Sequence, residues 1–376
     1  MSAASIASAA PSALQVQLSV AQYRIAVIGS VYLVAAIAMP LYNKALFSGW
    51  AHWSVAPFKH PLTATAVQLW GVVIVLVLAG ATSDLLLRPR GRVSMERRVR
   101  WATVLLHVLL PSLAFSGVIA LSNVGVQAVS VALHVLLKCG ELVAIVAAGA
   151  AIEREIPTLL GSVCSVIAAL GIALLSIDAH QELDVSVGAI LVHVGAVLCG
   201  GLHVALMRRA WRKLTDAASP NSPDRVALLD ADVRASQLAV RHEAPLLRRV
   251  ATAKLALAAT TVTIVAAAYE PAAWAELFDT SRTTTGTGLL MAAGVVLTIV
   301  FQLSNVAMPR YASSLSVAFV EQVKVFPQLL LALALGTGSI DVSPATVMGG
   351  VLVLAGTVGY ATERRVQSGA LGTKKW

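Results

Sequence analysis

Long apolar runs separated by short polar segments dominate the pattern of this chain. A helix needs about 20 apolar residues to cross the roughly 30 Å hydrocarbon core of a bilayer. Ten runs reach about that length, at 24–47, 62–87, 101–122, 125–150, 157–177, 186–208, 250–270, 286–306, 313–335 and 345–361. The pattern therefore predicts an all-α membrane protein with ten transmembrane helices, surrounded by a lipid bilayer.

Composition supports the same class. Hydrophobic residues make up 57% of the chain and charged residues 12%, with a mean hydropathy of +0.79. The 28 Lys and Arg outnumber the 19 Asp and Glu, but they lie in the gaps between apolar runs, so we expect no nucleic-acid partner. The three cysteines have neither metal-site nor disulfide spacing, and we expect no metal and no cofactor. The sequence has no His-Glu-x-x-His, Walker-type glycine loop or Gly-x-Ser-x-Gly motif, so we do not expect an enzyme.

The basic residues predict an orientation. They gather in the loop 88–100, in the stretch 208–254 and at the C-terminus. In a chain with ten helices these three regions fall on one side, which the positive-inside rule assigns to the cytosol. We therefore expect both termini to be cytosolic, with Glu270 and Glu276 on the opposite side.

A polar segment at 209–249 is the one sizeable insert in the sequence, and we interpret it as a cytosolic linker. It separates a first five-helix repeat, expected at 24–208, from a second at 250–361. An odd number of helices per repeat would give the two halves opposite orientations, as in many transporters. Residues 1–23 are rich in Ser and Ala and uncharged, so we expect a disordered tail, with a plastid transit peptide as the alternative. Residues 362–376 are expected to form a cytosolic C-terminal tail.

Two lysines occupy corresponding positions in similar apolar segments. A Ser-Val-Ala triplet begins eight residues before Lys138, at Ser130, and eight residues before Lys324, at Ser316. An ammonium at bilayer depth costs about 2.5–3.5 kcal/mol on insertion scales, so it persists mostly where it faces a cavity and a partner. The repetition predicts a polar site between two related halves.

Neighbouring polar residues extend this site along the helices. His134 and Glu141 share a helical face with Lys138 by three- and four-residue spacing. Glu321 has the same relationship to Lys324. The alternatives are that the glutamates only neutralise buried lysines, and that His134 is a packing residue.

Two asparagines complete the polar set within the apolar runs. Asn123 and Asn305 each form the centre of a Ser-Asn-Val triplet near a helix end. In these positions they could read ribose or base edges.

Four further motifs follow one another along the chain. Tyr42-Asn43-Lys44 closes the first helix, Pro61-Leu62-Thr63 opens the second, Lys138-Cys139-Gly140-Glu141 lies in the fourth and Lys324 lies in the ninth. In order and spacing they resemble the triose-phosphate and nucleotide-sugar branch of the drug/metabolite transporter superfamily. The resemblance implies ten helices in two inverted five-helix repeats that exchange one phosphorylated or nucleotide-linked solute for another. It also adds Asn43 and Lys44 to the candidate binding residues, although Lys44 near a helix end could instead reach to the interface.

The residue after the ninth-helix lysine separates the branches of that family. Plastid phosphate translocators typically have Lys-Arg there, whereas Val325 follows Lys324 in this chain. We therefore expect a secondary antiporter that exchanges a nucleotide sugar for a nucleoside monophosphate across a Golgi or ER membrane. The anionic substrate would be held between Lys138 and Lys324. The alternatives are a sugar-phosphate/phosphate exchanger of the plastid inner envelope and a non-transporting membrane scaffold on the same fold, and a homodimer is one oligomeric state that the sequence leaves open.

Overall fold

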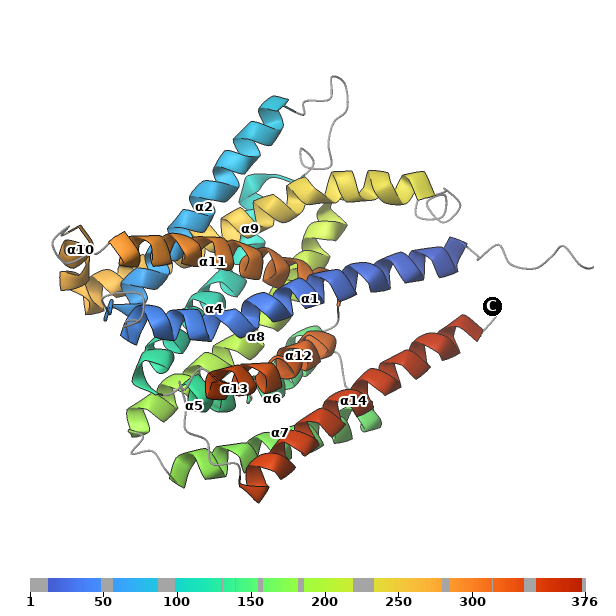
Figure 1. The fold of residues 1–376 in the computed structure, drawn as a ribbon. Helices are drawn as coiled ribbons and strands as arrows, with labels where there is room; N and C mark the ends of the chain where they lie inside the picture. Colours follow the sequence, from blue (N-terminus) through green and yellow to red (C-terminus); the bar gives the residue numbers. More distant parts are fainter. Residues whose placement is uncertain are drawn as a thin grey trace, which may run out of the picture.

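The computed structural model describes residues 13–48, 57–86, 99–129, 131–138, 140–154, 158–181, 186–218, 233–278, 285–312, 314–334 and 343–373. Every regular element within these ranges is a helix (Figure 1). The helices are α1 (Ala13–Ser48), α2 (Pro61–Leu86), α4 (Trp101–Ala128), α5 (Val131–Lys138), α6 (Glu141–Ala148), a short π-helix η3 (Gly149–Glu153), α7 (Leu159–Gln181), α8 (Val187–Ala218), α9 (Val233–Tyr269), α10 (Pro271–Phe278), α11 (Thr285–Tyr311), α12 (Ser314–Val323), α13 (Val325–Ala334) and α14 (Pro344–Thr373).

Among the described residues, six helices are long and apolar enough to cross a membrane. Their apolar spans are Ala26–Phe47, Pro61–Ser83, Trp101–Ala128, Val187–Ala217, Pro245–Tyr269 and Gly286–Tyr311. Large apolar side chains on their outer surfaces, such as Leu78, Leu106 and Ile264, are exposed. Helices that are apolar on all sides suit a hydrocarbon surrounding. The chain is therefore a multi-pass helical membrane protein, as the apolar runs predicted.

Four of the predicted spans have a different form. Helices α7 and α14 contain shorter apolar stretches, at Leu159–Gly171 and Val347–Tyr360. The runs 125–150 and 313–335 were expected as continuous helices, but each is broken, into α5 and α6 and into α12 and α13.

Two sequence features explain these breaks. Gly140 lies between α5 and α6, where a residue without a side chain lowers the helix propensity. Pro327 in the first turn of α13 has no N–H for the carbonyl group of Val323, and its ring disfavours a helix that continues through that carbonyl group.

The long helices pack in pairs. Helix α1 lies against α11, α4 against α8, α2 against α9, and α7 against α14 (Figure 1). The α7–α14 contact is close because glycines face backbone: a Cβ atom on Gly171 would lie 2.6 Å from the carbonyl oxygen of Gly349. This packing agrees with the small residues in both helices, which allow backbones to approach.

Several expected boundaries differ from the observed elements. Six of the ten predicted spans precede the 209–249 segment and four follow it, so a division into five and five helices would fall between α7 and α8 instead of at 209. The two repeats themselves stay a prediction. Helices α8 and α9 also extend into the predicted linker from both sides, to Ala218 and from Val233. Residues 219–232 of the linker lie outside the described residues.

The predicted tails are also partly helical. Helix α1 begins at Ala13, two residues after Pro11, and α14 continues to Thr373, with no proline after Pro344 to interrupt it. Residues 1–12 and 374–376, with Ser130 and most of the loop 88–100, lie outside the described residues.

Candidate functional site

A cavity lies among the helices, and both halves of the chain contribute to its wall. We call it the central cavity. Its wall contains all the candidate residues from the sequence except Lys44, namely Asn43, Asn123, His134, Lys138, Glu141, Asn305, Glu321 and Lys324.

The two repeated lysines stand at the two helix breaks. Lys138 is the last residue of α5, and Lys324 lies between α12 and α13. The broken helices contact each other crosswise, α5 with α13 and α6 with α12. A break frees backbone groups that a continuous helix would use internally, and inside a membrane this is tolerated where the chain is covered by protein or lines a cavity.

Each of these lysines has a carboxylate partner three residues away. The Nζ atom of Lys138 lies 3.3 Å from Oε2 of Glu141, and Lys324 forms an ion pair with Glu321. The Nζ atom of Lys324 also lies 5.9 Å from the centroid of the Tyr32 ring. Both lysines thus line the cavity with their charge balanced, and an anionic ligand would compete with the two glutamates for the ammonium donors.

A chain of neutral polar groups forms another part of the wall. Nδ2 of Asn43 donates to Oδ1 of Asn123 at 2.8 Å, and Nδ2 of Asn123 donates to Oγ1 of Thr65 at 2.5 Å. The Thr65 hydroxyl donates in turn to the carbonyl oxygen of Pro61 at 2.6 Å. The side chains come from α1, α4 and α2, so these hydrogen bonds hold the first three long helices together around the cavity.

A third lysine, Lys254, joins the corresponding polar groups of the second half. It is 0% exposed, and its Nζ atom lies 2.9 Å from Oδ1 of Asn305 and 3.2 Å from Nε2 of His203. Nδ1 of His203 lies 3.0 Å from the carbonyl oxygen of Pro111. Because a carbonyl oxygen only accepts, His203 carries a proton on Nδ1, and its Nε2 atom lies next to both Nζ of Lys254 and Oδ1 of Asn305, the latter at 3.1 Å. The ammonium also lies 3.9 Å from the centroid of the Phe115 ring, a cation–π contact.

Sequence reasoning missed Lys254 and His203 as site residues. Lys254 was counted among the basic residues of the stretch 208–254, and the structure instead buries it within α9. Its position inside the apolar run 250–270 was the available signal, because an intramembrane lysine indicates a polar site. Within the described part of the chain, Lys254 makes no ion pair, and Asn305 and His203 hold its Nζ atom next to the cavity wall.

His134 lines the cavity from α5 and is held by a second histidine. Nδ1 of His134 lies 3.0 Å from Nε2 of His193, and Nδ1 of His193 lies 2.7 Å from the carbonyl oxygen of Ala189. The carbonyl group requires the proton of His193 on Nδ1, so Nε2 of His193 accepts from His134. His134 is then a neutral imidazole whose Nε2 atom is a hydrogen-bond acceptor.

Lys44 has a different position from the other candidates. Its Nζ atom donates to the carbonyl oxygens of Val126 and Val129, at 3.3 and 3.0 Å, where α4 ends. A lysine at the last carbonyl groups of a helix satisfies acceptors that have no partner within the helix. Lys44 therefore fastens α1 to the end of α4 and does not line the central cavity.

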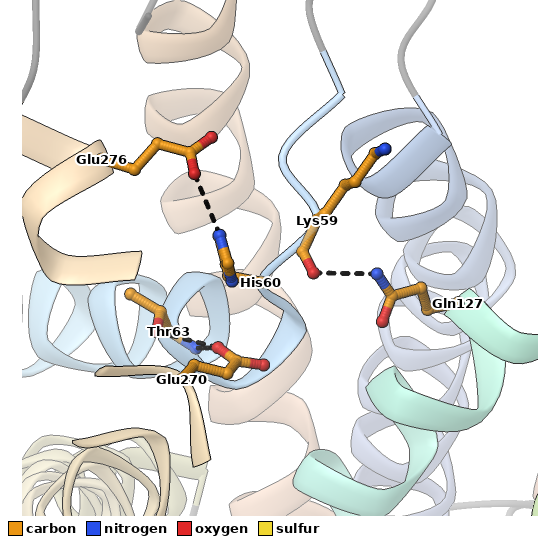
Figure 2. A network of polar contacts seen from close by, with 6 residues as sticks. All are labelled: Lys59, His60, Thr63, Gln127, Glu270 and Glu276. Carbon is orange, nitrogen blue, oxygen red and sulfur yellow. Dashed lines mark hydrogen bonds and ion pairs between the residues drawn. The ribbon is translucent and has the colours of Figure 1, made fainter. Parts of the chain in front are cut away.

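A polar network ties the start of α2 to the end of α9 (Figure 2). The carboxylate of Glu270 accepts from the backbone N–H groups of Leu62 and Thr63, at 3.1 and 2.8 Å. Nε2 of His60 lies 3.1 Å from Oε2 of Glu276 in α10. The side-chain amide of Gln127 donates to the carbonyl oxygen of Lys59 at 2.9 Å. These contacts place a charged cap on the first turn of α2, where orphan N–H groups favour a carboxylate.

The described residues contain no group of three or more His, Cys, Asp or Glu side chains that could hold a metal ion. The wall of the central cavity offers ammonium, carboxylate, amide, hydroxyl and imidazole groups. This set is suited to binding a polar anion by hydrogen bonds and charge.

Comparison with known proteins shows the fold and no more. No protein-family profile matches the chain, and no curated protein matches it. A solved structure described only as "Crystal structure of protein" has 14% sequence identity and a TM-score of 0.56, over 90% of this chain and 96% of that one. The chain thus shares its overall helical arrangement with a structurally characterised protein.

Proposed function

We propose that the protein is a secondary antiporter that exchanges a nucleotide sugar for a nucleoside monophosphate across a Golgi or ER membrane. One observation carries the proposal: Lys138 and Lys324, at the breaks of two crossing helices, line a single cavity inside a membrane protein. Intramembrane lysines that face a cavity are characteristic of solute pathways.

The chemistry of the cavity suits a phosphate. A phosphate that leaves water must receive fixed donors and positive charge, and an ammonium supplies three donors and a compact charge. In the proposed cycle the phosphate takes Lys138 and Lys324 from their glutamates. When the cavity is empty, Glu141 and Glu321 hold the lysines, which avoids two unpaired charges in the membrane.

The helix pairing supports two inverted five-helix repeats. If the second repeat begins at α8, then α1 corresponds to α8 and α4 to α11. The contact of α1 with α11 then has its counterpart in the contact of α4 with α8, and α2–α9 and α7–α14 pair corresponding helices. In transporters with such repeats, the site lies at the repeat interface and rocking of one part against the other gives alternating access.

The orientation and compartment follow from the charge pattern and the family resemblance. With both termini in the cytosol, the basic ends of α8 and α9 face the cytosol, and the Glu270–Glu276 network of Figure 2 faces the lumen.

Counterflow in proteoliposomes tests the proposal. Purified protein is reconstituted into vesicles preloaded with UMP, GMP, CMP or inorganic phosphate and is offered labelled nucleotide sugars and sugar phosphates. Uptake driven by one internal nucleoside monophosphate is the expected result. Uptake driven only by internal phosphate would replace the proposal with a sugar-phosphate/phosphate exchanger, and no uptake from any vesicle would favour the non-transporting scaffold.

A further inference from the structure

The carbonyl oxygen of the Asn43 side chain is a buried acceptor without a hydrogen-bond partner. Asn43 is 5% exposed, it lines the central cavity, and its Oδ1 atom makes no hydrogen bond within the described part of the chain. Burying an acceptor without a partner is costly, so such an atom in a cavity wall points to a ligand that supplies the donor.

The backbone carbonyl group of Pro61 fixes the orientation of the Asn43 amide through two intervening side chains. The single proton of the Thr65 hydroxyl is used on the backbone carbonyl of Pro61, so Oγ1 of Thr65 can only accept from Asn123. Asn123 therefore turns its Nδ2 toward Thr65 and its Oδ1 toward Asn43. Asn43 must then donate to Asn123 through Nδ2, which leaves its Oδ1 atom for the cavity. Since the backbone carbonyl group of Pro61 can only accept, it fixes the donor and acceptor roles in every hydrogen bond from Thr65 to Asn43.

Other uncharged side chains of the cavity wall also have buried oxygens without a hydrogen-bond partner within the described ranges. Oε1 of Gln302 and the hydroxyl oxygens of Ser122 and Thr298 line the cavity and have no hydrogen-bond partner within the described ranges. Nε2 of His134 is an acceptor as well, because its Nδ1 donates to His193. This part of the cavity wall therefore offers the acceptors of Asn43, Gln302 and His134, beside hydroxyl groups that can accept or donate.

We propose that Asn43 is a specificity-determining residue that accepts a hydrogen bond from the uncharged part of the substrate, while the lysines hold its phosphate. This inference rests on the proposed function. The ligand chemistry is an N–H or O–H donor joined to a phosphate, and its source is either a nucleobase N–H group or a ribose hydroxyl group. A site built around a fixed acceptor rejects an analogue that lacks the donor, because the acceptor then stays unpaired.

Matched ligand pairs test this inference by binding to the purified protein, without any transport step. UMP is compared with its N3-methyl derivative and GMP with IMP, which removes one base donor each, and UMP is compared with dUMP, which removes a ribose hydroxyl. Inorganic phosphate is the reference ligand. The wild type should bind at least one donor-deleted analogue about 10- to 100-fold more weakly than its parent. Weaker binding of N3-methyl-UMP or IMP than of its parent assigns the donor to the base. Weaker binding of dUMP than of UMP assigns the donor to the ribose.

Variants connect the discrimination to Asn43. In Asn43→Leu, parent and analogue should bind equally, at the level of the weaker one. Thr65→Val removes the hydroxyl group that orients the amides of Asn123 and Asn43, so it should also abolish discrimination between parent and analogue. Thr65→Ser keeps that hydroxyl group and should behave as wild type. The Thr65 pair decides the matter if Asn43→Leu does not fold.

Three outcomes overturn the inference. If the wild type binds each parent nucleotide and its analogue equally, and still binds phosphate, the role of Asn43 is refuted and the proposed function is not. Wild-type discrimination retained in Asn43→Leu or Thr65→Val does the same. If neither phosphate nor any nucleotide binds, the proposed function fails together with the inference.

Discussion

The Nζ atom of Lys254 lies 2.9 Å from Oδ1 of Asn305, so a fully buried ammonium orients an amide that lines the central cavity. Because an ammonium only donates, Asn305 must face it with oxygen, and its Nδ2 atom is left as a donor. Asn43 in the first half is oriented in the opposite sense, with its oxygen left free of internal hydrogen bonds. The two halves thus present amides of opposite polarity.

Replacement of Asn305 by aspartate separates folding from ligand binding. Asn305→Asp keeps an acceptor for Lys254 and turns the contact into a buried ion pair, so thermal stability should be equal to or above that of the wild type. It also removes the Nδ2 donor, so the apparent affinity for the transported nucleotide should fall about tenfold. Thermal unfolding and counterflow measure the two effects, and wild-type affinity in this variant would show that Asn305 does not contact the substrate.

Glu321→Gln should make stability dependent on an anion. The substitution leaves the buried ammonium of Lys324 without its carboxylate, and breaking a buried ion pair in this way costs about 3–5 kcal/mol. Inorganic phosphate that reaches Lys324 would replace the lost charge. We therefore expect a lower unfolding temperature without phosphate and a larger phosphate-induced rise than in the wild type. Glu141→Gln should repeat the result at Lys138, and a phosphate-induced rise no larger than that of the wild type would argue against phosphate at the lysines.

Lys44→Met should lower stability without weakening binding. Lys44 lies outside the cavity wall and holds the last carbonyl groups of α4, so its loss leaves acceptors unpaired and costs about 1–3 kcal/mol. Thermal unfolding should report the loss, and the concentration for half-maximal exchange should stay within about twofold of wild type. A tenfold rise in that concentration would return Lys44 to the binding site.

Gly171→Ala tests the close packing of α7 on α14. The added Cβ atom would lie 2.6 Å from a backbone oxygen, which cannot move without shifting the helix, so overpacking should cost about 1–3 kcal/mol. The matched control is Gly29→Ala in α1, where no atom lies within 4 Å of the new Cβ atom. There the better helix propensity of alanine should leave stability unchanged or raise it by up to about 1 kcal/mol. Equal unfolding temperatures of the two variants in detergent would contradict the tight α7–α14 contact.

The membrane class of the fold was predictable because apolar runs and their length carry it directly. The repeated Lys138 and Lys324 were predictable as well, since an intramembrane lysine is rare and its repetition is visible in the sequence. The cavity brings them together with Asn43, Asn123 and Asn305.

Other features depend on contacts between distant residues and could not be derived from a pattern. The apolar runs continue through both helix breaks, so hydropathy alone did not reveal them. The position of Lys254 in the apolar run 250–270 marked it as intramembrane, but its contacts with Asn305 and His203 depend on tertiary packing. Lys44 and Gln127 turn to backbone carbonyl groups because the neighbouring helix ends offer unpaired acceptors.

Exchange by the two lysine variants tests the central claim most directly. Vesicles preloaded with the nucleoside monophosphate that drives wild-type uptake are compared for wild type, Lys138→Ala, Lys324→Ala and the double variant, with equal amounts of inserted protein. Each lysine should contribute about 1.5–3 kcal/mol through charge-assisted hydrogen bonds to phosphate, so each single variant should lose about 10- to 100-fold in apparent affinity. The double variant should show no exchange above empty vesicles. Wild-type exchange by the double variant would contradict the assignment of the phosphate to Lys138 and Lys324.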